Sequence, residues 1–433
     1  MPPRRSSDTD ACPGALRLHA AADGMLARVR LPGGMLSGAQ LRSLRELAEE
    51  FGDHHLELTS RANLQLRALT ADDAPALASR LRAAGLLPST THDGVRNIAS
   101  PPLAGPPLRA LVGHLDRALL SDPVLATLPG KFLFAIGRVP LAADVAAVPA
   151  GAAGSFAIRF DGHDTGIRVG ADGVVPALIA AAHAFLAERE AQRESPDRSP
   201  HAAGPAVWRL RELAGGPGRV SARVVSALGL TPVPAPVAAP ADAPEPGDLI
   251  GVVPQAGGLA AIAALVPVGR VGGVPMKILE EADLLVVTPW RGVVVPDLTP
   301  EAARGWAGRL AGAGLAVTPG SPWSGVTACA GRPGCAKSLA DVRADATAAA
   351  RAVRGLPVHW VGCARACGSP AGPHVRAEAT GDGYLITRVP ASGDHPAVHV
   401  PEAAPANRGE PVDEGSGPVT GDLGDVVAVA RRP

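Results

Sequence analysis

The stretch LELTSRANLQLRAL at residues 56–69 has a counterpart later in the chain, LVVTPWRGVVVPDL at residues 285–298. The two stretches align without a gap, and Thr59 falls on Thr288. In each stretch, apolar residues flank a short turn on both sides, which predicts two strands joined by that turn. This repeated strand pair organises the expectations for the rest of the chain.

The elements around the two strand pairs recur in the same order. Before the first pair, residues 25–32 alternate like a strand, and residues 37–52 have the leucine spacing of an amphipathic helix with Ser37 as N-cap. Before the second pair, residues 258–284 give a strand and a crossover. Helix-like stretches follow both pairs, at 71–84 and 299–313. Two similar α/β units could arise by chance, but the matched order and a period of 229 residues (285 − 56) favour a tandem domain duplication.

The composition excludes several classes of protein. The chain has 433 residues, of which 46% are hydrophobic, and 41 basic residues balance 41 acidic ones. Zero net charge and 3% aromatic residues disfavour a nucleic-acid partner or a charged membrane surface. The N-terminus lacks the apolar core of a signal peptide, and we find no uninterrupted apolar run of about 18 residues. A cytoplasmic protein that contacts neither membrane nor nucleic acid is therefore expected.

Four of the five cysteines form a compact pattern, C-x5-C-x27-C-x3-C, at Cys329, Cys335, Cys363 and Cys367. In the register of the repeat, Cys329 falls on Ser100, so only the second copy carries these thiols. Clustered cysteines in a reducing compartment favour metal ligation over disulfides. An iron–sulfur cluster fits the surrounding glycines and alanines best, while zinc and free or redox thiols stay open. Cys12 is expected to be a buried or free thiol.

The stretch between the cysteine pairs predicts how they meet. Residues 338–355 read as a helix with a Ser338/Asp341 capping box and Gly355 at its end, and LPVHWV at 356–361 reads as a strand. Each pair then lies in a loop at the edge of a helix–strand unit, which can return the second pair to the first.

The cysteine pattern after a duplicated α/β chain resembles the sulfite and nitrite reductase superfamily. Three motifs of the first half strengthen the resemblance: LTSRANLQLR, DGVRNIASPPLAG and LPGKFLFAIG. The resemblance implies a [4Fe-4S] cluster on the four cysteines, with the last cysteine next to a sirohaem iron in the reductases. It also implies anion-binding or substrate-binding roles for Arg61, Asn63, Arg96, Asn97 and Lys131, and arginine and lysine suit the carboxylates of a tetrapyrrole.

Within the superfamily, the chain is most similar to the precorrin-3B synthase family over residues 12–400. That resemblance implies O2-dependent hydroxylation of precorrin-3A at C20 with γ-lactone formation, in aerobic cobalamin biosynthesis. It also implies a tetrapyrrole substrate, a separate reductase that uses NAD(P)H or ferredoxin, and possible mononuclear non-haem iron. Leu133 stands where assimilatory sulfite reductases have a second lysine, and GCARAC at 362–367 departs from both families' usual forms.

Two alternatives remain at this point. A sirohaem-dependent sulfite or nitrite reductase would use the same cysteines, and a zinc-stapled binding protein would leave the basic motifs unexplained. No catalytic residue is identified. His92 and Asp93 are weighed as iron ligands, but a solvated loop pair is the preferred interpretation.

The expected fold is α+β, a tandem duplicated nitrite/sulfite reductase-like fold in which each half has a ferredoxin-like half-domain and an α/β domain. The expected divisions are 12–70 and 71–230 for the first half, a Pro/Ala-rich linker at 231–247, 248–313 and the cluster domain 314–400 for the second half, and a loose tail at 401–433.

Overall fold

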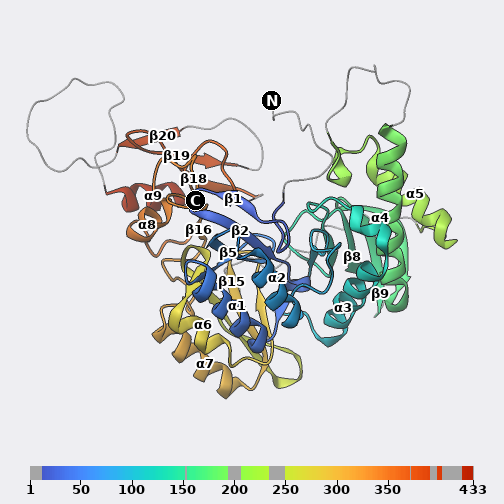
Figure 1. Cartoon of the computed structure of the whole chain (residues 1–433), viewed down its shortest axis with the longest axis horizontal. Coiled ribbons are helices and arrows are strands. Elements are labelled where there is room, and N and C mark those ends of the chain that lie inside the picture. Colours follow the sequence, from blue (N-terminus) through green and yellow to red (C-terminus); the bar gives the residue numbers. More distant parts are fainter. Residues whose placement is uncertain are drawn as a thin grey trace, which may run out of the picture.

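The computed structural model describes residues 12–151, 154–193, 206–233, 249–370, 372–390, 397–401 and 422–432. Most of the expected linker and most of the expected tail lie outside these residues. Four five-stranded sheets, here called sheets A to D, make up the described strands. Sheets A and B lie together in the lower centre of Figure 1, sheet C lies to their right, and sheet D lies above them.

Sheets A and B have the same strand order and exchange one strand with each other. Sheet A runs in the order β1 (His19–Ala21), β2 (Gly24–Val29), β5 (Leu64–Leu69), β4 (His55–Leu58) and β13 (Arg270–Gly272). Sheet B runs in the order β11 (Gly251–Pro254), β12 (Ala260–Leu265), β15 (Gly292–Leu298), β14 (Leu285–Val287) and β3 (Met35–Leu36). Each half therefore completes the sheet of the other half, which the sequence did not predict.

The turn of the repeated strand pair is the same in both halves. The Thr59 amide donates to the Asn63 carbonyl at 2.9 Å, and the Thr288 amide donates to the Gly292 carbonyl at 2.9 Å. Each threonine hydroxyl also accepts from the amide four residues ahead, at 3.0 and 2.8 Å. These matched hydrogen bonds confirm the duplication and its register.

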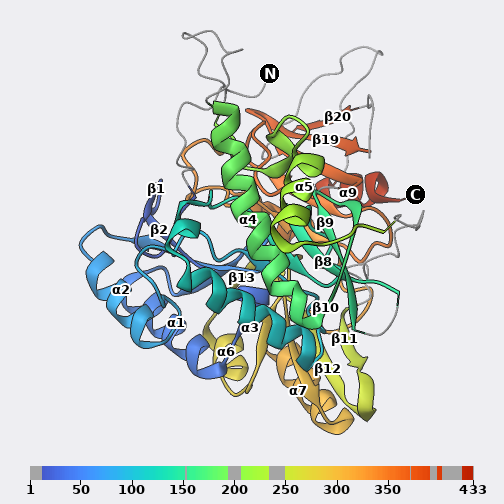
Figure 2. The ribbon, with the colours of Figure 1, turned by 90° about the vertical axis from the view of Figure 1, so that its right-hand side faces the viewer.

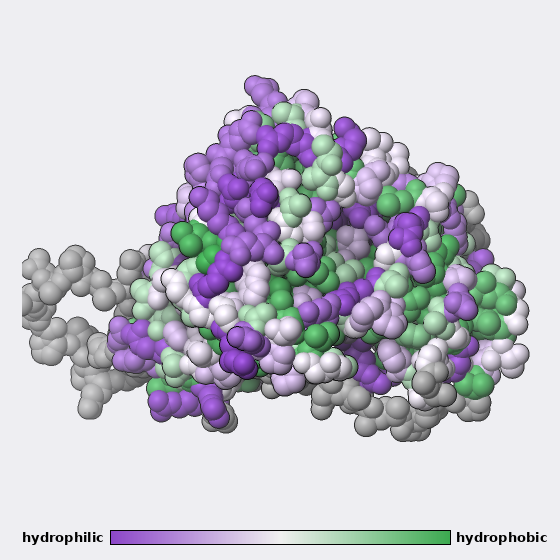
Figure 3. Space-filling model, turned by 90° about the horizontal axis from the view of Figure 1, so that it is seen from below, coloured by the Kyte–Doolittle hydropathy of each residue, from purple (hydrophilic) through white to green (hydrophobic). Residues whose placement is uncertain are grey.

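Four helices cover sheets A and B: α1 (Gly38–Phe51), α2 (Ala74–Ala83), α6 (Gly273–Leu279) and α7 (Pro300–Gly312). The Ser37 hydroxyl caps α1 by accepting from the Gln40 amide, as expected. The predicted leucine face is buried, with Leu41, Leu44 and Leu47 in one core. Figure 3 views the molecule from below, where hydrophilic residues gather at the upper left and hydrophobic residues are interspersed with polar ones over the rest of the face.

Sheets C and D also repeat one strand order. Sheet C consists of β6 (Ile98–Ala99), β7 (Phe134–Ile136), β8 (Val145–Pro149), β9 (Ser155–Phe160) and β10 (His163–Gly170). Sheet D consists of β16 (Val326–Ala328), β17 (Val358–Val361), β18 (His374–Ala379), β19 (Gly383–Val389) and β20 (Ala397–Pro401). In each sheet the first three strands are parallel and the other pairs antiparallel. Ser100 follows β6 as Cys329 follows β16, in agreement with the sequence register.

Three helices pack with sheet C: α3 (Pro106–Ser121), α4 (Ala171–Arg193) and α5 (Gly216–Leu228), and Figure 2 shows α4 running the length of this layer. By length and composition alone, α4 is apolar enough to cross a membrane. Its apolar residues instead pack in the core of sheet C, where Phe185 contacts Phe132. This burial is typical of a core helix.

Glu188 on α4 ties that helix to α5. Its buried carboxylate accepts from Arg219 at 2.6 Å and from Arg223. Burial raises the pKa of Glu188, but the hydrogen bonds and charges of the two arginines outweigh burial and lower the pKa below its usual value.

We expect Glu188→Gln to lower the free energy of unfolding at pH 7 by about 1.5 kcal/mol, because a neutral amide accepts weaker hydrogen bonds from the two arginines than the carboxylate does. A lowered carboxylate pKa stabilises the fold above the unfolded value of 4.5 and loses that effect as pH falls through the folded value. Urea unfolding between pH 7 and pH 3 should therefore show the difference shrinking with acid. Glu190→Gln, whose Arg193 partner is exposed at 4.0 Å, is the matched control and should change little. A pH-independent difference would contradict the assignment.

Two expectations at the C-terminal end need correction. The helix predicted at 338–355 is only α8 (Val342–Ala348), capped by Asp341, whose carboxylate accepts from the Ala344 amide at 3.2 Å. Ser338 is not the cap, because its hydroxyl donates to the Ala340 carbonyl. Gly355 does not end a helix. It lies so close to Arg431 that a Cβ atom there would meet the Arg431 carbonyl oxygen at 2.0 Å.

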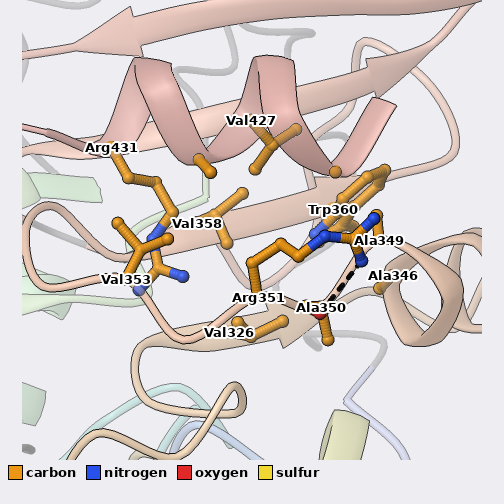
Figure 4. Close-up of a pocket in the computed structure, with 12 residues that line it drawn as sticks. Val326, Ala346, Ala349, Ala350, Arg351, Val353, Val358, Trp360, Val427 and Arg431 are labelled. Carbon is orange, nitrogen blue, oxygen red and sulfur yellow. Dashed lines mark hydrogen bonds between the residues drawn. The ribbon is translucent and has the colours of Figure 1, made fainter. Parts of the chain in front are cut away.

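The expected loose tail contains a docked helix, α9 (Leu423–Arg431), which packs on β18 and β19. Val427 and Ala428 are buried, and the Arg431 guanidinium donates to the Leu356 and Ser324 carbonyls at 2.8 and 2.6 Å. Figure 4 shows α9 above the strands, with a cavity of about 10 Å³ beneath it. A cavity of that volume holds at most one water, so this is a packing gap and not a ligand site.

Candidate iron–sulfur and substrate site

The topology of sheet D brings the two cysteine loops to one edge. Cys329 directly follows β16 and Cys363 closely follows β17, and these neighbouring strands are parallel. The carboxyl ends of parallel strands lie at the same edge, which is where α/β sheets place their sites. The Cys329 amide donates to the Trp360 carbonyl at 2.9 Å, which joins the loops at their start.

The charges of Cys329, Cys335 and Cys363 all reach Cys367. Burial raises the pKa of Cys367, Arg365 opposes that rise, and the other three cysteines add to it. The Gly362 amide donates to the Cys329 sulfur at 3.4 Å, as amides around cluster sulfurs do. Within the described ranges, no three His, Cys, Asp or Glu side chains are grouped closely enough to hold a single metal ion. A cubane binds each cysteine to a different iron, so the donor set and the amide–sulfur contact fit a [4Fe-4S] cluster.

His359 positions the loop of Cys367 through a hydrogen bond to its backbone. This histidine is fully buried, its Nε2–H donates to the Cys367 carbonyl at 3.0 Å, and its Nδ1 accepts from the Thr327 hydroxyl at 2.7 Å. Burial, then the charge of Arg291, lowers the pKa of His359 to about 3. The ring is neutral and its tautomer is determined by its two partners, so it holds the carbonyl as a fixed donor.

A buried charged network connects the cysteine loops to sheet A of the first half. Arg67 on β5 donates to both Asp23 carboxylate oxygens at 2.9 and 2.8 Å and to the Gly334 carbonyl at 2.6 Å. Arg343 on α8 pairs with Glu57 on β4 at 2.6 Å and donates to the Cys329 carbonyl at 3.2 Å. The first half therefore supports the cluster loops although it carries none of the four cysteines.

Arg61 and Lys131 each lie close to one end of the segment Trp208–Arg209, because the charge of Arg209 acts on Arg61 and Lys131 contacts Trp208. Lys131 lies over the Trp208 ring, with its Nζ 4.6 Å from the centroid. Burial lowers the pKa of Arg61, and the charges of Arg209 and Arg28 lower it further. Sequence reasoning missed these two additional arginines, because nothing in their local motifs marks them and only the fold brings them to Arg61.

The other three predicted binding residues are engaged by the protein itself. Arg96 forms a two-pronged ion pair with Asp116 of α3 at 2.7 and 2.8 Å, and both are largely buried. The Asn63 side chain accepts from the Leu31 amide at 2.9 Å. The Asn97 side chain accepts from Arg30 at 3.2 Å and donates to the Gly130 carbonyl at 2.8 Å. These contacts hold loops together. In the described part of the chain, Arg61 and Lys131 are the members of the set whose side chains form no hydrogen bond or ion pair.

His92 is neither an exposed loop residue nor a free metal ligand. It is buried, its Nε2–H donates to the Asp122 carbonyl at 2.9 Å, and its Nδ1 lies 2.9 Å from the Thr91 hydroxyl. With both ring nitrogens engaged, no lone pair remains for iron. The Asp93 carboxylate accepts from the Leu16 amide at 3.0 Å.

Comparison with known proteins agrees with this architecture. Residues 19–84 match the nitrite/sulfite reductase ferredoxin-like half domain. The structure superposes on that of the NirA protein of Mycobacterium tuberculosis with a TM-score of 0.68 and 21% identity, covering 86% of this chain and 75% of that one. The chain has a nitrite/sulfite reductase-like fold. That likeness confirms the expected α+β architecture.

Relatives of this fold include two kinds of enzyme. The chain is 29% identical to a ferredoxin–nitrite reductase of Synechococcus elongatus over 80% of its own length and 74% of the relative's. It is 27% identical to a precorrin-3B synthase of a Sinorhizobium species over 90% of its own length and 85% of the relative's. The predicted similarity to the precorrin-3B synthase family is thus confirmed, and the nitrite reductases are similar to the same degree.

Proposed function

We propose that the chain is a precorrin-3B synthase, an oxidoreductase that hydroxylates precorrin-3A at C20 with O2 and closes a γ-lactone. Its resident cofactor is a [4Fe-4S] cluster on Cys329, Cys335, Cys363 and Cys367. The tetrapyrrole is substrate and not prosthetic group. The similarity to the synthase extends over more of both chains than the similarity to the nitrite reductase.

The observation that carries this proposal is which of the predicted basic residues are already paired within the protein. A small inorganic oxyanion needs several converging cations, yet Arg96 is already neutralised by Asp116. Leu133, where a second lysine would stand, is 3% exposed and packs with Ala99 and Ala135. The cationic groups that remain, around Arg61 and Lys131, suit the widely spaced carboxylates of a large substrate better than one small anion.

The chain's own residues would determine which carbon of the macrocycle reacts. Arg61 and Lys131 would pair with peripheral carboxylates, and Arg28 would add positive charge beside Arg61. Arg209 lies there too, but it is paired with the buried Asp144 at 2.8 Å. Such positioning converts an unselective oxidant into a regioselective one. When bound, the cluster supplies electrons one at a time. The donor would be a separate ferredoxin, as the names of the ferredoxin-dependent relatives suggest, or a separate reductase that uses NAD(P)H.

The test is turnover of precorrin-3A under ¹⁸O2 with a chemical or enzymatic electron donor. We expect a product that carries one oxygen atom from O2. Arg61→Ala should lower kcat/KM by roughly 10- to 100-fold, because one charge-assisted hydrogen bond to a carboxylate is lost, and Arg61→Lys should recover part of it. Arg80→Ala, an exposed arginine on α2, is the control. Unlabelled product, or equal turnover by Arg61→Ala, would contradict the proposal.

A sirohaem-dependent nitrite reductase is the second candidate, because the identity to nitrite reductases is as high as that to the synthase. Reduction of nitrite by the purified protein with bound sirohaem would establish this alternative.

A further inference from the structure

Arg291 occupies a strained position in the turn beside the cysteine loops. Its φ of 61° is in the left-handed region, which favours glycine or asparagine. The equivalent residue of the first half is Ala62, with a φ of 57°. The turn geometry is therefore common to both halves, and the half with the cysteines places an arginine on it.

The Arg291 side chain lies directly against the loop of Cys367. A Cβ atom at Gly368 would be 2.8 Å from the Arg291 Nη2, and one at Gly269 would be 2.5 Å from its Cδ. Both glycines have positive φ and leave the space that the arginine occupies. Burial lowers the pKa of Arg291 to about 10, Arg343 lowers it too, and Glu57 and Cys329 oppose this. The guanidinium therefore lies against the loop of Cys367 and within range of the Cys329 charge.

The charges around Arg291 do not balance. Asp23 and Glu57 offset Arg67 and Arg343, two against two. In the described part of the chain, the Arg291 guanidinium has no ion pair or side-chain hydrogen bond. A partly buried cation without an ion pair is costly, so its retention indicates that an anion normally occupies the adjacent space. A cubane held by four thiolates is such an anion, and one-electron reduction makes it more negative.

We propose that Arg291 supplies the uncompensated positive charge that holds the anionic cluster and raises its reduction potential. The proposal rests on the cluster ligation stated above, but not on the identity of the substrate. Arg291 is a positioning residue that acts on the electron-transfer group.

The test is a dye-mediated dithionite titration of the reconstituted full-length protein, followed by EPR of the one-electron reduced cluster. At a fixed solution potential, Arg291→Gln should shift the ratio of reduced to oxidised cluster at least tenfold toward oxidised. For one electron this corresponds to a fall of about 59 mV in the reduction potential of the cluster. Arg291→Lys, which keeps the charge, should retain most of the wild-type potential. Arg365→Gln removes an exposed arginine between Cys363 and Cys367 and should shift the potential by less than half as much, because solvent screens that charge.

Thermal unfolding of the cluster-free protein separates charge from packing. Without the anion, Arg291→Gln removes an unpaired charge, so its melting temperature should equal or exceed that of the wild type. A lower melting temperature with an unchanged potential would overturn the proposal in favour of a packing role. An unchanged potential with weaker tetrapyrrole binding would overturn it in favour of substrate recognition. If Arg291→Gln fails to assemble a cluster, retention by Arg291→Lys supports the proposal, and loss in both overturns it. If Cys335→Ser loses the cluster but Arg291→Gln leaves both the cluster and its reduction potential unchanged, the inference about Arg291 is refuted and the ligand assignment stands.

Discussion

Cys335→Ser should abolish the iron–sulfur cluster, with loss of the broad visible absorbance and of stoichiometric iron and sulfide. A serine hydroxyl is a poor substitute for thiolate as a ligand to iron. Cys335 also stabilises its loop, because its amide donates to the Gly331 carbonyl at 2.8 Å, but that bond uses the backbone and survives the substitution. The measurement is iron, sulfide and absorption after anaerobic purification.

Cys12→Ser is the matched control for this change. Cys12 lies in the first half, where its charge acts on Arg61, far along the chain from the four cysteines. We expect wild-type iron content in this variant. Iron retained by Cys335→Ser, or lost by Cys12→Ser, would show that the ligand assignment is wrong.

Arg67→Ala should lower the free energy of unfolding by about 3–5 kcal/mol and weaken cluster retention. The substitution removes the buried guanidinium that donates to Asp23 and to the Gly334 carbonyl. The Asp23 charge then stays largely buried without its partner, which is strongly destabilising. Urea unfolding followed by tryptophan fluorescence measures the loss.

The control for Arg67→Ala is Arg80→Ala. Arg80 pairs with Glu46 and Glu50 on the surface, where all three side chains are exposed and the pair contributes at most about 1 kcal/mol. Equal losses in the two variants would mean that the network between the first half and the cysteine loops contributes no special stability.

Local patterns predicted much of the fold. The leucine spacing and the Ser37 cap predicted α1, and the repeated strand pair predicted β4, β5, β14 and β15. The exchange of β3 and β13 was not predictable, because strands of two and three residues carry no periodicity and pair only through the tertiary structure. The docking of α9 depends likewise on a sheet edge that is distant in sequence.

The candidate site, like the fold, was predictable from the sequence only in part. Spacing alone identified the four cysteines as one group, and the fold brings their loops to one edge of sheet D. Motifs alone could not show that Arg96 is paired with Asp116, twenty residues away on α3. Nor could they identify Arg28, Arg209 or Arg291, whose roles arise from neighbours that only the folded chain supplies.

The central claim is that a [4Fe-4S] protein of this fold acts on a tetrapyrrole as substrate without resident sirohaem. The most direct measurement is the absorption spectrum, with iron, sulfide and haem content, of the anaerobically purified protein. We predict a broad iron–sulfur shoulder and no haem bands. A Soret band together with a band in the red, characteristic of sirohaem, would contradict the account.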